Sequence, residues 1–275
     1  MSNLKVGLQL YSVRDYMEKD FEGTLKKVKE IGYDYVEMAG YFGKTAEEIR
    51  AILDKYELKC ISVHQRLDFY KEKQTEAINF IKKLGAQYYT IPWFEKEKLY
   101  NDLENTIREF SDAGKVLKEN GLELLYHNHD FEFVKVGNEL VIDIIYSTVD
   151  KEYLNPEFDT CWVKYAGYEP TEYLEKYRGR IRVVHIKDFY AEKMCGDPVY
   201  GLIDGEENEM QVNQKEQNKF EFRPVGDGIQ DIKAIVEKSI EVGAEAIIVE
   251  QDDWYDGDSL EFAEKSRKYL KSLGY

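Results

Sequence analysis

The sequence has little cysteine and no long apolar run. Its three cysteines, Cys60, Cys161 and Cys195, are widely spaced and form no CxxC pair, so neither a disulfide framework nor a cysteine-rich zinc site is indicated. No stretch of 18 or more apolar residues is present, so no membrane span is expected. The first residues lead into a strand pattern without the apolar core of a signal peptide, and a cytoplasmic protein is expected.

Positive charge is also scarce. The 275 residues include 54 Asp and Glu against 38 Lys and Arg, which gives a net charge of -16. Contacts to phosphate require clustered basic side chains, so a nucleic-acid partner is not expected. We interpret the acidic surface as favouring solubility. The hydrophobic content of 43% is ample for a substantial core.

Short apolar segments alternate with helical patterns along the whole chain. Between the segments, apolar residues recur at spacings of three and four, and a glycine commonly follows the last of them. The eight strand-like segments are Lys5–Ser12, Tyr35–Ala39, Lys59–Gln65, Tyr88–Trp93, Leu122–His129, Asn155–Trp162, Ile181–Asp188 and Glu245–Asp252. This alternation predicts an α/β fold of parallel strands joined by crossover helices, and the count predicts a (β/α)8 TIM barrel in a single domain, residues 1–275. A doubly wound open sheet is the rival, but no glycine-rich turn follows the first segment.

One long polar segment, residues 189–224, interrupts this alternation after the seventh strand. It carries the acidic residues Asp197, Asp204, Glu206, Glu207 and Glu209. In a barrel, this connection rises from the face that holds the active site. Three interpretations are open: a lid over a substrate, a subunit contact that would make a homo-oligomer, or a solvated insertion.

Residues able to bind a metal ion close four consecutive strand-like segments. They are His127, Asp159, His185 and Glu250. Because a barrel brings its strand ends into one ring, these side chains are expected to converge. Two imidazoles and two carboxylates suit a divalent ion such as Mn²⁺, Co²⁺, Zn²⁺ or Fe²⁺, with Mn²⁺ preferred here. A single strand His or Asp is more often a hydrogen-bonded core residue, but four buried together would be costly without a cation.

Several segments resemble those of the sugar phosphate isomerase/epimerase family of xylose isomerase-like barrels. The segments are Gly7–Arg14, Tyr126–Phe133, Phe158–Thr160, Val184–Asp188 and Pro224–Gly228. The resemblance implies a metal held by Glu, Asp, His and Glu at the ends of strands five to eight. Three of those positions match Asp159, His185 and Glu250, whereas His127 stands where the epimerases have Glu. His129, two residues further on the same strand face, would then bind substrate or act in catalysis.

Other residues near the strand ends are candidates for substrate binding or for catalysis. Glu250 and His129 are candidates for the base, and Lys187 for a contact to developing negative charge. The candidates for substrate binding are His64, Glu37, Trp93 and Arg223. Arg223 is included because it resembles a substrate-binding position of the epimerases.

The resemblance implies a metal-dependent isomerase or epimerase of a small keto-sugar that removes the proton α to a carbonyl and passes through an enediolate. The alternative is a keto-cyclitol dehydratase of the inosose type, since loss of a β-hydroxyl follows the same first step. Two further classes are weighed. An endonuclease IV-like repair enzyme is disfavoured by the net charge of -16, and the last class is a noncatalytic barrel subunit.

Overall fold

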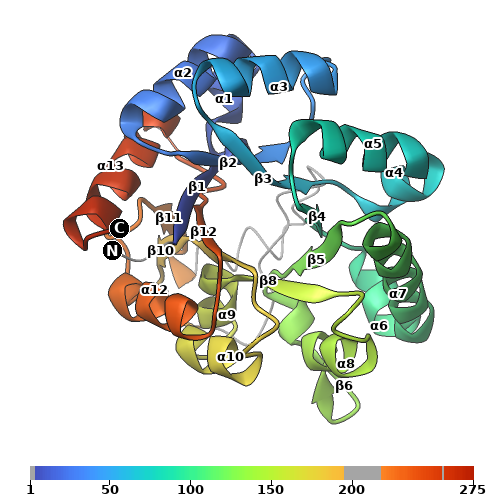
Figure 1. Cartoon of the computed structure of the whole chain (residues 1–275). Coiled ribbons are helices and arrows are strands. Elements are labelled where there is room, and N and C mark those ends of the chain that lie inside the picture. Colours follow the sequence, from blue (N-terminus) through green and yellow to red (C-terminus); the bar gives the residue numbers. More distant parts are fainter. Residues whose placement is uncertain (1–3, 195–217, 256) are drawn as a thin grey trace.

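The barrel predicted from the sequence is present. The computed structural model describes residues 4–194, 218–255 and 257–275. Its eight parallel strands close in the order β1-β12-β9-β8-β5-β4-β3-β2 (Figure 1). These strands are β1 (Lys5–Gln9), β2 (Tyr35–Ala39), β3 (Lys59–His64), β4 (Tyr88–Ile91), β5 (Glu123–His127), β8 (Asn155–Asp159), β9 (Val183–Ile186) and β12 (Ala246–Val249). Each lies within one of the eight segments predicted as strands.

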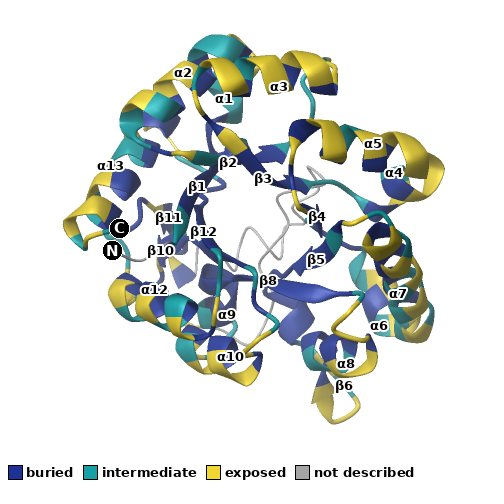
Figure 2. Ribbon diagram, viewed as in Figure 1, coloured by how far each residue is buried: buried dark blue, intermediate teal, exposed yellow. Residues whose placement is uncertain are grey.

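Helices surround the barrel and bury one face each against it, as the alternation of dark blue and yellow along them shows (Figure 2). The larger ones are α2 (Phe21–Ile31), α3 (Ala46–Lys55), α5 (Gln74–Leu84), α7 (Leu103–Glu119), α8 (Val141–Thr148), α12 (Ile232–Glu241) and α13 (Ser259–Ser272). Shorter helices are α1 (Arg14–Met17), α4 (Leu67–Glu72), α6 (Lys96–Asn101), α9 (Thr160–Tyr165) and α10 (Pro170–Lys176), with the 3-10 turns η1 (Leu10–Val13) and η2 (Phe131–Phe133). None of the helices in the described part of the chain is both long and apolar enough to span a membrane.

Local sequence signals explain where several helices begin and end. Thr45 and Glu48 form a reciprocal capping box that starts α3, which satisfies backbone N–H groups that have no partner within the helix. Pro170 occupies the first turn of α10, where its missing N–H costs nothing. Gly32 and Gly85 cap α2 and α5 with φ of 106° and 76°, a conformation that glycine adopts without steric cost.

The barrel interior changes character along the strands. Its lower part is filled by a cluster of apolar side chains, namely Ile61, Tyr88, Leu125, Val183, Ala246 and Ile248. Nearer the carboxyl ends, buried polar side chains replace them, and His127, Glu157 and His185 are each at most 2% exposed. An apolar plug therefore closes the barrel from below, and the polar groups face its upper mouth.

One segment departs in part from the element expected for it. Cys161 and Trp162 were predicted on a strand, but the strand ends at Asp159 and both residues lie in α9. The Asp159 carboxylate caps this helix and accepts hydrogen bonds from its first N–H groups, which turns the chain into a helix directly.

The described ends of the segment 189–224 pair with each other. Strand β10 (Asp188–Tyr190) runs antiparallel to β11 (Glu221–Arg223), and Phe189 and Phe222 each lie within an aromatic cluster that includes Phe220. Residues 195–217, which carry the acidic residues expected to form a lid or a subunit contact, lie outside the described residues. A smaller antiparallel ribbon pairs β6 (Lys135–Val136) with β7 (Glu139–Leu140) through a turn at Gly137 and Asn138.

Candidate metal centre and active site

A cavity of about 270 Å³ opens at the carboxyl ends of the barrel strands. Most of the side chains around it are polar, and several are the strand-end residues singled out from the sequence. Its walls are formed by Tyr11, Ala39, His64, Gln65, Arg66, Pro92, His127, His129, Lys187, Glu250 and Asp252. The cavity thus lies at the end of the barrel where loops and strand ends of a TIM barrel form binding sites.

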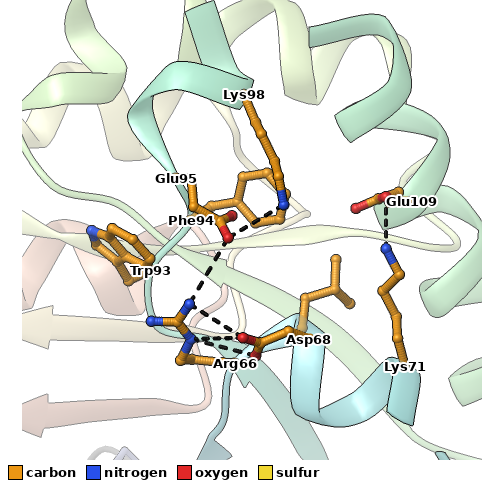
Figure 3. Close-up of a pocket in the computed structure, with 9 residues that line it drawn as sticks. Arg66, Asp68, Lys71, Trp93, Phe94, Glu95, Lys98 and Glu109 are labelled. Atoms are coloured by element: carbon orange, nitrogen blue, oxygen red, sulfur yellow. Dashed lines mark hydrogen bonds and ion pairs between the residues drawn. The ribbon is translucent and has the colours of Figure 1, made fainter. Parts of the chain in front are cut away.

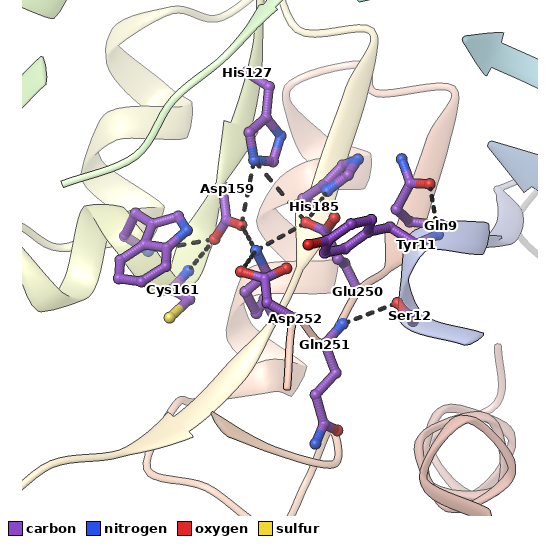
Figure 4. Close-up of polar contacts among 12 residues, drawn as sticks. Gln9, Tyr11, Ser12, His127, Asp159, Cys161, His185, Glu250, Gln251 and Asp252 are labelled. Atoms are coloured by element: carbon purple, nitrogen blue, oxygen red, sulfur yellow. Dashed lines mark hydrogen bonds and ion pairs between the residues drawn. The ribbon is translucent and has the colours of Figure 1, made fainter. Parts of the chain in front are cut away.

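Four of the predicted ligands converge beneath this cavity (Figure 4). One ligand atom from each of His127, Asp159, His185 and Glu250 lies within 4.8 Å of the other three. The His127 Nε2 is 3.6 Å from Asp159 Oδ2 and 3.9 Å from Glu250 Oε2. A divalent ion with bonds of about 2.0–2.2 Å holds its ligands roughly 3–4.4 Å apart. This set, the outer group, therefore has the composition and the spacing to hold a divalent ion.

The two carboxylate oxygens of Asp159 have different partners. Its Oδ1 accepts hydrogen bonds from the backbone N–H groups of Cys161, at 2.8 Å, and Trp162, at 3.3 Å. Its Oδ2 faces the outer group and lies 2.8 Å from the Lys187 Nζ. The helix start therefore fixes the carboxylate and leaves one oxygen directed at a cation.

Lys187 brings a positive charge into the same place. Its side chain is 1% exposed, and its Nζ lies 2.8 Å from Asp159 Oδ2, 2.8 Å from Glu250 Oε2 and 3.0 Å from Asp252 Oδ2. Burial opposes its charge, but these carboxylates outweigh the burial and raise the pKa of Lys187 well above its usual value. The ammonium and a divalent ion would therefore compete for oxygens of Asp159 and Glu250.

The two acidic neighbours of Lys187 differ in their pKa. Burial alone would raise the pKa of Glu250, but Lys187 and His185 outweigh it and hold the pKa well below its usual range. Burial raises the pKa of Asp252 to about 6, although Lys187 opposes the shift. Glu250 is thus an anion at neutral pH, as a metal ligand must be.

A second set of polar side chains lies next to the outer group and forms the inner group: Glu37, His64 and Glu157. His64 Nε2 is 2.7 Å from Glu157 Oε1 and 3.1 Å from Glu37 Oε2. Gln9 Nε2 donates a hydrogen bond of 2.8 Å to Glu37 Oε2, and the Thr90 hydroxyl donates one of 3.0 Å to Glu157 Oε2. Both carboxylates are fully buried.

The four histidines differ in the direction in which their pKa is shifted. Burial would lower the pKa of His64 and His185, but Glu37 and Glu157 outweigh it and raise the pKa of His64 to about 10 and that of His185 well above its usual value. Burial lowers the pKa of His127, and it lowers that of His129 far more. His127 and His129 are therefore neutral at pH 7, and a neutral imidazole is the form that binds metals or accepts protons.

Some of the predicted site residues lie at the cavity and others do not. Residues His64, His129, Lys187 and Glu250 line the cavity, and Glu37 reaches it through its contact with His64. His129 stacks on Phe131 at 5.4 Å between ring centroids. The structure does not bring the other two candidates to the cavity wall: Arg223 lies on β11, paired with Glu221, and Trp93 lies beside Arg66.

Arg66 joins the cavity to a small polar niche at its rim (Figure 3). Its guanidinium lies 3.2 Å from Asp68 Oδ2 and 3.9 Å from Glu95 Oε1, and it lies over the Trp93 ring at 4.8 Å from the centroid. Trp93 thus packs behind an arginine that lines the cavity, whereas the sequence suggested that it would contact the substrate itself.

Several polar residues of the site were missed from the sequence. Glu157 lies two residues before Asp159, and Asp252 lies two residues after Glu250. On a strand, residues two apart share a face, so the spacing that grouped His127 with His129 would also have found Glu157. Asp252 lies past the end of β12, where this alternation no longer holds.

Comparisons with known proteins agree with this architecture. The sequence pattern of the xylose isomerase-like TIM barrel family matches residues 25–273. The inosose dehydratases of Mesomycoplasma hyopneumoniae strain 7448 and of Clostridium beijerinckii are 28% and 25% identical to this chain, and the alignments cover 99% and 92% of it and 97% and 90% of those proteins.

Two solved structures resemble this chain over almost their whole lengths. A sugar phosphate isomerase/epimerase from Parabacteroides distasonis superposes with a TM-score of 0.78 and 21% identity, covering 99% of this chain and 95% of that one. The IolI protein with a bound zinc atom superposes with a TM-score of 0.66 and 15% identity, covering 98% of both chains. At such identities the structural likeness shows a shared fold. The family pattern covers most of the chain, and the protein belongs to the xylose isomerase-like TIM barrel family.

Proposed function

We propose that this chain is a divalent-metal-dependent isomerase or epimerase of a small polyhydroxylated ketone, such as a keto-sugar or a keto-cyclitol. The observation that carries the proposal is the outer group, His127, Asp159, His185 and Glu250, gathered beneath a cavity of about 270 Å³. A cavity of this size accommodates a small sugar, and the polar side chains among its lining residues, such as His64, His129 and Lys187, suit hydroxyl groups.

The donor set fits a divalent ion. It offers two imidazoles and two carboxylates, and Asp159 Oδ2 is buried with no hydrogen-bond donor besides the Lys187 ammonium among the described residues. We propose Mn²⁺ as the ion, with Co²⁺, Zn²⁺ or Fe²⁺ compatible with the same donors. When bound, such an ion supplies Lewis-acid polarisation of a substrate carbonyl, which acidifies the neighbouring C–H bond.

The chain's own residues would then move the protons. Glu250 or the neutral His129 ring accepts the proton from the carbon α to the carbonyl, and the electron pair of that C–H bond passes to the carbonyl oxygen. The Lys187 ammonium at the cavity wall stabilises the negative charge of the resulting enediolate. Return of the proton to the neighbouring carbon gives the isomer, and return to the opposite face gives the epimer.

Dehydration is the second candidate, and two observations favour it. Curated relatives matching nearly the whole chain are inosose dehydratases, and Lys187 places a proton donor 2.8 Å from the candidate base Glu250. After the α-proton is removed, the β C–O bond breaks, and the Lys187 ammonium gives its proton to the departing hydroxide, which leaves as water. The ketone product is then α,β-unsaturated.

Proton exchange tests both candidates together. We would load the protein with Mn²⁺ and follow keto-sugars and inososes in D₂O by NMR. We expect deuterium to enter a carbon α to the carbonyl, and the product distinguishes isomer, epimer and unsaturated ketone. Glu250→Gln and His129→Asn should each reduce the exchange rate at least 100-fold if that residue is the base, whereas the surface variant Glu104→Gln should leave it unchanged. Absence of exchange from every α-hydroxyketone would refute the proposal.

Metal content tests the site independently of any substrate. Asp159→Ala and His185→Ala each remove one of the proposed protein ligands of the outer group, so each should lose the ion bound there. Elemental analysis of the purified variants measures this directly. Full metal retention in both would contradict the assignment of the ligands.

A further inference from the structure

A buried carboxyl group holds the segment that carries His129. Glu132 lies in the 3-10 turn η2 and is fully buried. Its Oε2 accepts a hydrogen bond of 2.8 Å from the backbone N–H of His129, and its Oε1 accepts one of 2.5 Å from the hydroxyl of Tyr126. Tyr126 lies on β5, so the carboxyl group connects the loop after β5 to the strand itself.

This connection lies where the hydrogen bonds of the barrel no longer fix the chain. The last paired residue of β5 is His127, and the three residues after it belong to no helix or strand. The side-chain amide of Asn128 accepts a hydrogen bond of 3.0 Å from the backbone N–H of Asp159, which holds the start of the loop. Backbone groups outside a strand ladder need other partners, and Glu132 is the partner of the His129 N–H.

The position of the His129 ring follows from the backbone of this loop. The ring lines the cavity and stacks on the ring of Phe131, with 5.4 Å between the centroids and 7° between the planes. The carbonyl of Phe131 accepts a hydrogen bond of 2.8 Å from the hydroxyl of Tyr100, so the ring that supports His129 is itself held in place. A displaced backbone at His129 would therefore move its ring away from Phe131 and change its direction in the cavity.

A carboxyl group is a costly choice for this buried place. Burial of a polar group is unfavourable unless its hydrogen bonds to water are replaced, and apolar replacement of both partners in a buried hydrogen bond is often nearly neutral. Burial raises the pKa of Glu132 to about 8, so at neutral pH the group is an acid with a carbonyl oxygen for the His129 N–H and a hydroxyl for Tyr126. Glutamine offers a matching pair, an oxygen and an NH₂ group, in nearly the same shape.

We propose that Glu132 is a positioning residue for the reaction: it holds the backbone of His129 so that the imidazole points from the cavity wall toward the substrate. Glu132 is not among the residues that line the cavity, so it acts through His129. The inference rests on the proposed function, in which His129 is a candidate to accept the proton of the substrate. A purely structural role is the competing explanation, and it predicts lost stability without a change in the His129 ring or in turnover.

The ring of His129 can be observed directly, without substrate or metal. The chain has four histidines, so the proton NMR spectrum of chelator-stripped protein at one fixed pH contains four Cε1–H signals, and His129→Asn identifies the signal of His129 by its loss. The aromatic ring of Phe131 shifts that signal through its ring current. We expect Glu132→Met, which removes both hydrogen bonds, to move the signal toward the position of an unstacked imidazole. Glu132→Gln should leave it in place.

Turnover tests the consequence for the reaction. Exchange of the α-proton of an inosose or keto-sugar would be measured in D₂O as kcat and KM of the Mn²⁺-loaded protein. Because a displacement of about 1 Å near the reacting atoms costs on the order of 100-fold in rate, Glu132→Met should lower kcat about 10- to 100-fold with KM nearly unchanged. Glu132→Gln should restore most of the rate. Tyr33→Phe removes another buried tyrosine hydroxyl, bonded to the Ala263 carbonyl at 2.9 Å, and should leave kcat unchanged.

The outcomes separate positioning from a structural role. Circular dichroism would confirm that each variant is folded, and elemental analysis would compare its metal content with that of the wild type. A folded Glu132→Met with either the wild-type His129 signal or the wild-type kcat would overturn the positioning role, and so would equal losses of kcat in Glu132→Met and Glu132→Gln.

A second variant covers the case in which Glu132→Met does not fold. Tyr126→Phe removes only the bond to the Glu132 Oε1, so we expect a smaller shift of the His129 signal in the same direction, and an unshifted signal would overturn the proposal. Absence of exchange from every substrate in the wild type would refute the proposed function alone, because the NMR signal reports the position of His129 without any substrate.

Discussion

The buried Lys187 leads to a prediction in which stability and metal affinity change in opposite directions. We consider Lys187→Met, which keeps the length and most of the volume of the side chain but removes its charge. The Nζ lies 2.8–3.0 Å from three buried carboxylates. Removing one partner from a buried ion pair costs about 3–5 kcal/mol, because the remaining charge is left uncompensated. The free energy of unfolding of the metal-free protein should fall by about that amount.

The affinity for a divalent ion should rise in the same variant. The wild-type ammonium and the ion draw on the same oxygens of Asp159 and Glu250, so removing the ammonium removes both a competitor and a repulsive charge. Two unit charges about 4 Å apart interact by roughly 4 kcal/mol at an effective dielectric constant near 20. In the wild type, the lysine side chain can move away when the ion binds, which reduces this repulsion. We therefore expect the affinity of the variant for Mn²⁺ to be at least tenfold higher, or about 1.4 kcal/mol.

Urea unfolding in the presence of chelator measures the stability, and calorimetric titration with Mn²⁺ measures the affinity. Lys187→Arg keeps the charge and should not gain affinity. Lys118→Met, which removes an exposed lysine paired with Glu152, should leave both quantities nearly unchanged. If Lys187→Met bound Mn²⁺ no more tightly than the wild type, the ammonium and the ion would not share ligands, and the reasoning would be refuted.

Two further predictions concern residues that are not among the proposed metal ligands. Burial raises the pKa of Glu132 to about 8, so the folded protein keeps a proton on this carboxyl group at pH values where the unfolded chain has lost it. The free energy of unfolding should therefore fall by several kcal/mol as the pH rises from about 4.5 to 8. The urea midpoint of Glu132→Gln should change less with pH across this range. An unchanged slope in the variant would contradict the assignment. In α7, a Cβ at Gly114 would lie 1.9 Å from the backbone oxygen of Tyr153, so Gly114→Ala should lower the free energy of unfolding by about 3 kcal/mol or more. Gly137→Ala, which meets nothing within 4 Å but has φ of 68°, should cost about 1 kcal/mol, and equal thermal shifts for the two would argue against the steric explanation.

The architecture could be predicted from the sequence because its signals are local. Most barrel strands are short segments rich in apolar residues, and glycines such as Gly32 and Gly85 mark helix ends through a backbone conformation that other residues rarely adopt. The prediction of a strand was wrong where a residue of the apolar segment starts a helix instead. Cys161 and Trp162 continue an apolar run, but the Asp159 carboxylate caps a helix there, and the strand pattern gives no sign of that hydrogen bond.

The convergence of the four proposed metal ligands, His127, Asp159, His185 and Glu250, could also be anticipated, because strand ends converge in any barrel and these positions follow from counting strands. Contacts made by loops could not. Trp93 lies just after β4 and packs behind Arg66, and Arg223 pairs with Glu221 of the same strand. The direction of such side chains depends on loop conformation, which no periodicity in the sequence describes.

The charge balance of the cavity floor was likewise hidden from the sequence. Glu157 follows Pro156 in a short strand of mixed composition, Asn155–Asp159, and Asp252 is one of several acidic residues after β12. Only the structure shows that both are buried and that Lys187 lies among Asp159, Glu250 and Asp252. To infer this burial and this contact from the sequence, one would need the register of the barrel strands, because the register decides which residues lie in the same layer. The register also includes an irregularity between β2 and β3.

Asp188 ties the start of the segment 189–224 to its end. Its carboxylate accepts hydrogen bonds from the backbone N–H groups of Gly226, Gly228 and Gln230 at 3.0–3.2 Å, and the pairing of β10 with β11 holds the strands next to this turn. The chain that joins these strands therefore leaves and re-enters the barrel at neighbouring points. For such a closed connection, doubling its length costs only about 0.6 kcal/mol of chain entropy. Evolution could thus lengthen, shorten or replace this connection while the barrel strands and the residues at their carboxyl ends stayed in place, which lets one barrel framework carry connections of very different length and sequence.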